Sequence, residues 1–134
     1  MSRAILADAG PLFAAVDPDD AYHKRAQSEL KRAAQEKREL IVSYSTLLET
    51  HALVSRRLGA KVAESWLTDI LASARFVNPS VEDYIAGAMK LATFTDQSIT
   101  LFDSVLAVLS TRLRIQVWTY DHHFDVMRSE VWRP

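Results

Sequence analysis

Short apolar runs alternate along this chain with longer segments in which apolar residues recur every three or four positions. Short runs bounded by turn residues predict buried strands, and the longer spacing predicts helices with one buried face. We expect strands at 4–7, 40–43, 75–79 (with its turn) and 115–119, and a last edge strand at Val131–Trp132. We expect helices at 11–16, about 21–37, 45–58, 60–73, 80–92 and about 100–112.

This alternation of strands and helices is typical of a parallel sheet with helices packed on both faces. We therefore predict one α/β domain over residues 1–134, with three α/β/α layers and a central parallel sheet of four or five strands. The chain shows no internal repeat, low-complexity segment or linker that would divide it.

Composition narrows the class of protein further. Hydrophobic residues make up 49% and charged residues 25% of the chain, which is ordinary for a globular domain. There is no cysteine, which excludes disulfides, zinc fingers and thiol catalysis and fits a reducing compartment. The chain has no apolar run long enough to span a membrane and no signal-peptide pattern near its start. We expect a cytoplasmic protein without a membrane partner.

The net charge of −1 gives the molecule no general basic field for nucleic acid. The polar helix at about 21–37 has two interpretations. Lys24, Lys31 and Arg38 recur seven apart and could form a ridge for a phosphate backbone. Because Glu29 and Glu36 are interleaved at pairing distance, we favour a solvated helix face.

Acidic residues follow several predicted strands. Asp8 ends the first strand, Glu49 lies in the first turns after the second, and Asp121 follows the strand at 115–119. Asp103 begins the apolar helix that precedes that strand, where a carboxylate is favoured by the helix dipole. Ligands of open parallel sheets bind beyond the carboxyl ends of the strands. We therefore expect these acids to meet at one edge.

A structural interpretation stands beside this one for two of the acids. Thr46-x-x-Glu49 and Thr100-x-x-Asp103 both match the capping-box pattern, in which the acid bonds the backbone at a helix start. Each box is reasonable alone. Convergence of all four acids on one edge, however, is not something that independent caps require.

Clustered carboxylates repel one another, by about 4 kcal/mol for two charges ~4 Å apart at an effective dielectric constant of ~20. Cations relieve that repulsion, and an all-oxygen donor set favours Mg²⁺ or Mn²⁺. Two such ions activate water and stabilise the leaving oxygen of a phosphodiester. No G-x-S-x-G elbow, P-loop or G-x-G-x-x-G run points to another chemistry.

Four segments resemble, in order, the signature segments of PIN-domain ribonucleases, most closely the toxins of VapBC-type toxin–antitoxin systems. They are Ile5–Leu12, Ser45–Leu53, Leu101–Leu106 and Thr119–Phe124. The resemblance spans nearly the whole chain and implies Mg²⁺- or Mn²⁺-dependent endonucleolytic cleavage of RNA. It also implies a homodimer and an inhibitory antitoxin partner.

The resemblance carries the family's acids onto particular residues. It implies that Asp8, Glu49, Asp103 and Asp121 are catalytic and bind the metal, supported by Thr119, with Asp125 and Asp96 as further acids. His122 and His123 are adjacent, so we expect them to point in different directions and not to share one ion. A non-catalytic PIN-like module that binds RNA or protein is the alternative. A phosphoacceptor receiver domain is disfavoured because no lysine follows Lys90.

Overall fold

The computed structural model describes residues 3–134 and shows a sheet of four parallel strands. The strands are β1 (Ile5–Ala7), β2 (Leu40–Ser43), β3 (Arg75–Val77) and β4 (Gln116–Trp118), in the spatial order β3-β2-β1-β4. The predicted α/β class and parallel sheet are confirmed. The prediction of a last edge strand at Val131–Trp132 is wrong, because Val131 makes only an isolated parallel bridge to Val117.

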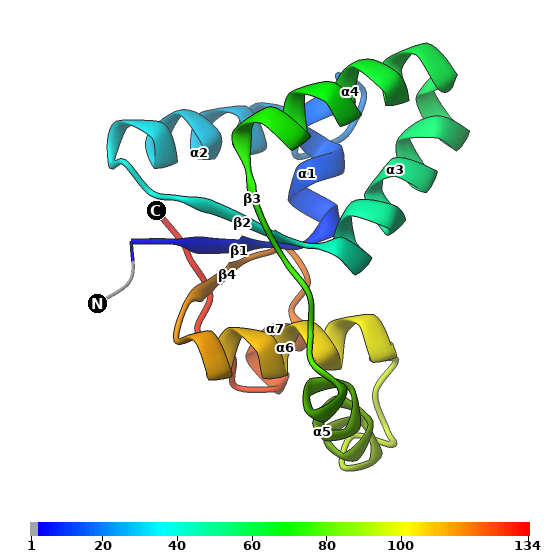
Figure 1. The fold of residues 1–134 in the computed structure, drawn as a ribbon, viewed down its shortest axis with the longest axis vertical. Helices are drawn as coiled ribbons and strands as arrows, with labels where there is room; N and C mark the ends of the chain where they lie inside the picture. The colour runs from blue at the N-terminus through cyan, green and yellow to red at the C-terminus, as the bar shows by residue number, and fades with distance from the viewer. Residues whose placement is uncertain (1–2) are drawn as a thin grey trace.

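Helices cover both faces of the sheet (Figure 1). One layer holds α1 (Ala9–Val16), α2 (His23–Gln35), α3 (Tyr44–Leu58) and α4 (Ala60–Ser73). The other holds α5 (Val81–Ala92), α6 (Leu101–Leu113) and the short α7 (His123–Val126). None of the helices within residues 3–134 combines the length and apolar character that a membrane crossing needs.

The two layers bury separate hydrophobic cores, which explains the unbroken apolar runs of the strands. Ile5 and Ala7 pack into the core under α1 to α4, whereas Leu6 packs into the core under α6 and α7. Because side chains alternate along a strand, a strand buried on both faces is apolar at every position. Trp118 and Phe124 are fully buried, as expected of core residues.

Helix α1 begins at Ala9, two residues earlier than predicted. Asp8 is its N-cap and accepts a hydrogen bond from the backbone N–H of Ala9 at 2.8 Å. Pro11 therefore occupies the first turn, where its missing N–H costs no intrahelical bond. The Gly-Pro pair that predicted a turn lies inside the helix, and the strand passes directly into α1 at the edge of the sheet.

Candidate functional site

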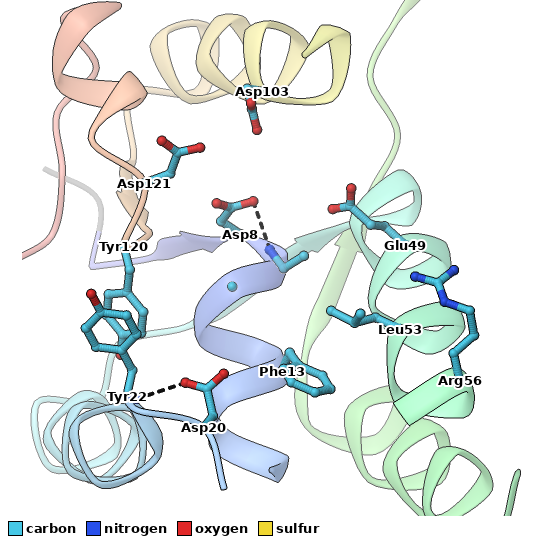
Figure 2. A pocket seen from close by; sticks show the side chains of 12 residues that line it. Asp8, Phe13, Asp20, Tyr22, Glu49, Leu53, Arg56, Asp103, Tyr120 and Asp121 are labelled. Carbon is cyan, nitrogen blue, oxygen red and sulfur yellow. Dashed lines mark hydrogen bonds between the residues drawn. The ribbon is translucent and has the colours of Figure 1, made fainter. Parts of the chain in front are cut away.

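An open cleft lies at the carboxyl edge of the sheet, between the layer of α1 and α3 and the start of α6 (Figure 2). All four predicted acids line it. The full lining is Asp8, Ala9, Gly10, Phe13, Asp20, Tyr22, Glu49, Leu53, Arg56, Asp103, Tyr120 and Asp121. The structure thus brings Asp8 and Asp103, which are far apart in the sequence, to the same hollow.

Asp8 lies at the floor of the cleft, where β1 passes into α1. Its Oδ1 accepts the Ala9 N–H, and its Oδ2 accepts the hydroxyl of Thr119 at 2.8 Å. The pKa of Asp8 is raised to about 6, mainly by burial and also by the negative charges of Asp103 and Glu49, which together outweigh the lowering effect of the two hydrogen bonds. Asp8 is therefore held in a fixed orientation in which its charge is disfavoured.

Glu49 points into the cleft from α3, and the capping-box interpretation of it is wrong. The N-cap of α3 is Ser43, so Thr46 is already inside the helix and Glu49 lies a turn further along. The side chain is therefore free of the backbone and faces the other acids (Figure 2). Partial burial and the charge of Asp103 both raise the pKa of Glu49.

Asp103 both caps helix α6 and lines the cleft. Its Oδ2 accepts the N–H of Thr100 while its own N–H donates to the Thr100 hydroxyl, both at 3.2 Å, which completes the capping box of α6. The same carboxylate lines the cleft. Its pKa is raised by burial and then by the charge of Asp121, against the lowering effect of the cap.

Thr119 connects the ends of β1 and β4. Besides donating to Asp8, its hydroxyl oxygen accepts the backbone N–H of Asp121 at 3.0 Å, and the residue is only 5% exposed. Asp121 is anchored in turn, since its Oδ1 accepts the backbone N–H of His123 at 2.9 Å. Thr119 thus connects the carboxylate of Asp8 to the backbone at Asp121.

The two adjacent histidines do not diverge as expected. Their ring centroids are 4.3 Å apart, and Nδ1 of His123 and Nδ1 of His122 lie 2.9 and 3.8 Å from Asp121 Oδ1. The reason is that this segment is a turn leading into α7, whereas the argument from divergent directions holds for extended chain. Ring nitrogens and a carboxylate oxygen of these three residues lie within 4.8 Å of one another.

The donor chemistry fits a hard divalent cation. The acids that line the floor contribute carboxylate oxygens from four segments, and the pKa values of Asp8, Glu49 and Asp103 are all raised. Raised values mean that the folded protein disfavours the charged forms. A bound cation removes that penalty, and oxygen-only donors favour Mg²⁺ or Mn²⁺ over softer metals.

Two of the predicted acids are not brought to this cleft. Asp125 forms an ion pair with Arg133 at 2.6 Å, and Asp96 lies exposed in the loop before α6. Neither lines the hollow. Sequence reasoning also missed cleft residues, namely Asp20, Tyr22, Arg56 and Tyr120. A signal was present for Tyr120, which immediately precedes a predicted acid at a strand end.

Glu29 is the clearest departure from the sequence interpretation of α2. It is 8% exposed, and its Oε1 accepts the indole N–H of Trp118 at 2.9 Å and the hydroxyl of Tyr120 at 2.6 Å. Arg25, one helical turn earlier, contacts its other oxygen at 3.2 Å. Glu29 therefore holds the end of β4 and the residue that follows Thr119 instead of belonging to a solvated face.

Comparison with known proteins places the chain in a family. No curated protein matches the sequence. Solved structures that share its fold include the VapC20 toxin of Mycobacterium tuberculosis, which cleaves the sarcin–ricin loop; its TM-score is 0.83 and its sequence identity 22%, over 97% of this chain and 99% of that one. VapBC2 from Rickettsia felis, bound to a DNA fragment from its promoter, has a TM-score of 0.77 and 13% identity over 97% of both chains. FitAcB from Neisseria gonorrhoeae has a TM-score of 0.73 and 19% identity over 97% of both chains. The family model for the PIN domain matches residues 5–129, so this chain belongs to the PIN domain family.

Proposed function

We propose that this protein is a Mg²⁺- or Mn²⁺-dependent endoribonuclease that hydrolyses phosphodiester bonds of RNA. The observation that carries the proposal is the cleft in which Asp8, Glu49, Asp103 and Asp121 lie together. The PIN family assignment and the likeness in fold to a toxin that cleaves the sarcin–ricin loop support it. The hydroxyl beside the acids, that of Thr119, is engaged by Asp8 and by the backbone of Asp121, which suits hydrolysis by water.

The four acids would hold the ion. When bound there, a divalent cation supplies a Lewis acid for the phosphate and lowers the pKa of water. The Thr119 hydroxyl donates to Asp8 and accepts the backbone N–H of Asp121, while the capping box orients Asp103. Without a cation the carboxylates repel the phosphate backbone, so we expect RNA to enter the cleft productively only with metal present.

Cleavage of a panel of structured RNAs tests this function. We expect endonucleolytic products with Mg²⁺ or Mn²⁺ and none with EDTA. Asp103→Asn keeps a side-chain oxygen for the cap and removes a charge, and we expect cleavage to fall at least about tenfold. Asp69→Asn makes the same chemical change on an exposed position of α4, outside the cleft, and serves as the matched control.

Two outcomes would contradict the proposal: no cleavage of any RNA, or cleavage that is unaffected by EDTA and by Asp103→Asn. A thermal melt separates the nuclease from a module that only binds. A metal site in the native state raises the melting temperature as Mn²⁺ is added, by mass action. We expect this rise in the wild type and a smaller one in Asp103→Asn, whereas a pure binding module shows little response.

We propose further that the nuclease is the toxin of a type II toxin–antitoxin pair acting in the cytoplasm. Two proteins of similar fold, VapBC2 and FitAcB, support this proposal. The test is the neighbouring reading frame. A small DNA-binding protein encoded beside this gene, which copurifies with the chain and blocks its RNA cleavage, is the expected result.

A homodimer is the assembly we propose, through an apolar surface on α5 and α6. We define this apolar surface by its exposed residues, Val81, Tyr84, Ile85, Met89, Leu101 and Phe102. Exposed apolar side chains gathered in this way mark interaction surfaces. We expect Ile85→Glu to convert a dimer into a monomer in light scattering, whereas Leu71→Glu, on α4 outside the apolar surface, leaves the mass unchanged. A monomeric wild type, or a dimer that survives Ile85→Glu, contradicts this assignment.

A further inference from the structure

Two tyrosine rings form one wall of the acidic cleft, and the proposed hydrolysis gives them no role (Figure 2). Tyr22 and Tyr120 have ring centroids 4.8 Å apart, with an angle of 36° between the ring planes. Tyr22 is 47% exposed although it lies beside a partly buried ring. An aromatic ring that remains this accessible at the rim of a cleft has surface left over for a ligand.

The wall is held rigidly from behind. The hydroxyl of Tyr120 donates to the buried Glu29 at 2.6 Å, and burial followed by that hydrogen bond raises the pKa of Tyr120. The guanidinium of Arg25 lies 4.4 Å from the centre of the Tyr120 ring and 5.9 Å from that of Tyr22. The backbone N–H of Tyr22 donates to Asp20 at 2.8 Å. Because the wall is already ordered, a ligand that stacks on it meets little entropic cost.

A positively charged side chain, that of Arg56, lies on the opposite wall of the cleft. Arg56 projects from α3 across the cleft from the tyrosines (Figure 2). It is exposed, and no carboxylate of residues 3–134 forms an ion pair with it. Aromatic faces with a free cation nearby are the combination by which proteins hold single-stranded nucleic acid, since bases stack on the rings while arginine contacts the backbone.

We propose that Tyr22, supported by Tyr120, is a stacking platform for one unpaired RNA base next to the cleaved phosphate, with Arg56 contacting the backbone on the other side. This inference rests on the proposed function and adds to it the residue that contacts the base beside the cut. A base paired within a helix is stacked on its neighbours and cannot offer its face to Tyr22.

Tyrosine variants test the platform in the full chain, once the wild type's cut site has been mapped on a cleaved RNA. Stacking of a base on an aromatic ring is worth roughly 5- to 150-fold in affinity. We expect Tyr22→Ala to lower kcat/KM by a factor in this range, and Tyr22→Phe, which keeps the ring, to cleave as the wild type does. Tyr44→Ala removes a tyrosine that is 43% exposed and also paired with another ring, but lies outside the cleft, so it controls for general effects.

An RNA with one abasic nucleotide beside the cut supplies the decisive comparison. We expect the missing base to slow the wild type by the same factor as Tyr22→Ala does, and to slow Tyr22→Ala no further. Equal cleavage by Tyr22→Ala and wild type, or a loss that is the same on intact and abasic RNA, overturns the platform. Either result would mean that the two tyrosines contact a protein ligand and not an RNA base.

A binding measurement separates failure of the platform from failure of the nuclease. The fluorescence of Tyr22→Trp in the presence of Mg²⁺ needs no cleavage to report on stacking. We expect quenching by a short unpaired oligoribonucleotide and much less by the abasic oligomer of equal charge. Quenching without cleavage refutes the nuclease and retains the base site, whereas cleavage without quenching does the reverse.

Discussion

Asp8→Asn should abolish RNA cleavage and at the same time make the metal-free protein more stable. Asp8 lies at the centre of the acid cluster, since the charges of both Asp103 and Glu49 act on it. Loss of a group that binds a catalytic ion removes several kcal/mol of transition-state stabilisation, so we expect a fall in kcat/KM of about a thousandfold. Asparagine can keep both contacts, because its oxygen accepts from Ala9 and its amide donates to the Thr119 hydroxyl, which reverses the direction of that second hydrogen bond.

The gain in stability should depend on pH with a defined sign. The pKa of Asp8 is about 6 in the folded protein and near 3.8 in the unfolded chain, so below pH ~4 the group is protonated in both states and costs nothing. As pH rises from about 4 to about 6, the carboxyl group ionises in the unfolded chain before it does in the folded protein, so the free energy of unfolding falls by up to about 3 kcal/mol. The Asp8→Asn variant has no carboxyl group to ionise at this position, so its free energy of unfolding does not fall in this way.

Chemical denaturation in EDTA at pH 4 and at pH 7.5 measures this difference. We expect the wild type and Asp8→Asn to have similar unfolding free energies at pH 4 and to diverge at pH 7.5 in favour of the variant. Added Mn²⁺ should reverse the order by stabilising only the wild type. Asp69→Asn is again the control. An Asp8→Asn protein that is less stable than wild type at pH 7.5 in EDTA would show that Asp8 is structural and would weaken the metal assignment.

Side chains added at Gly87 should separate α5 from α6. A Cβ built on Gly87 would lie 2.6 Å from Cγ2 of Val105 and 3.1 Å from its Cα, so the backbones of the two helices touch here. Gly87→Ala gains ~1 kcal/mol of helix propensity, which overpacking of about 1–3 kcal/mol outweighs. Gly87→Leu cannot be accommodated by a small shift, and we expect it to lower the unfolding free energy by about 3 kcal/mol.

Gly10→Ala is the matched control, because nothing lies within 4 Å of a Cβ built there although Gly10 is also helical. We expect it to be neutral or slightly stabilising in denaturant melts. If Gly87→Ala were as stable as Gly10→Ala, the close approach of α5 and α6 would not limit stability. Loss of the apolar surface's alignment in Gly87→Leu should also weaken dimerisation.

Much of the architecture could be predicted because local patterns and burial agree. Leu6 and its neighbours form an apolar run since both faces of β1 are covered, and β1 pairs with β2 and β4 in register at that residue. The acids at 8, 49, 103 and 121 could be placed at one edge because parallel strands share the direction of their carboxyl ends. Their assignment as metal ligands stays a prediction.

The rest depends on contacts between residues far apart in the chain. Glu29 has the spacing of a surface ion pair, yet its partners Trp118 and Tyr120 lie 89 and 91 residues away. Tyr22 gives no sequence signal because its position beside Tyr120 arises only when α2 packs against the end of β4. Glu49 was ambiguous for a local reason: the pattern beginning at Thr46 looks like a helix start, but α3 had already begun at Tyr44.

The hydrogen bonds that hold Asp8 and Asp103 have a consequence for binding kinetics. Both oxygens of Asp8, and one oxygen of Asp103, are already fixed by the protein's own N–H and O–H groups. A cation that bound at this proposed site would therefore meet carboxylates whose rotamers are already fixed, so little reorganisation would separate encounter from coordination. Metal uptake should accordingly follow a single fast phase whose rate is set by shedding of the ion's own water shell.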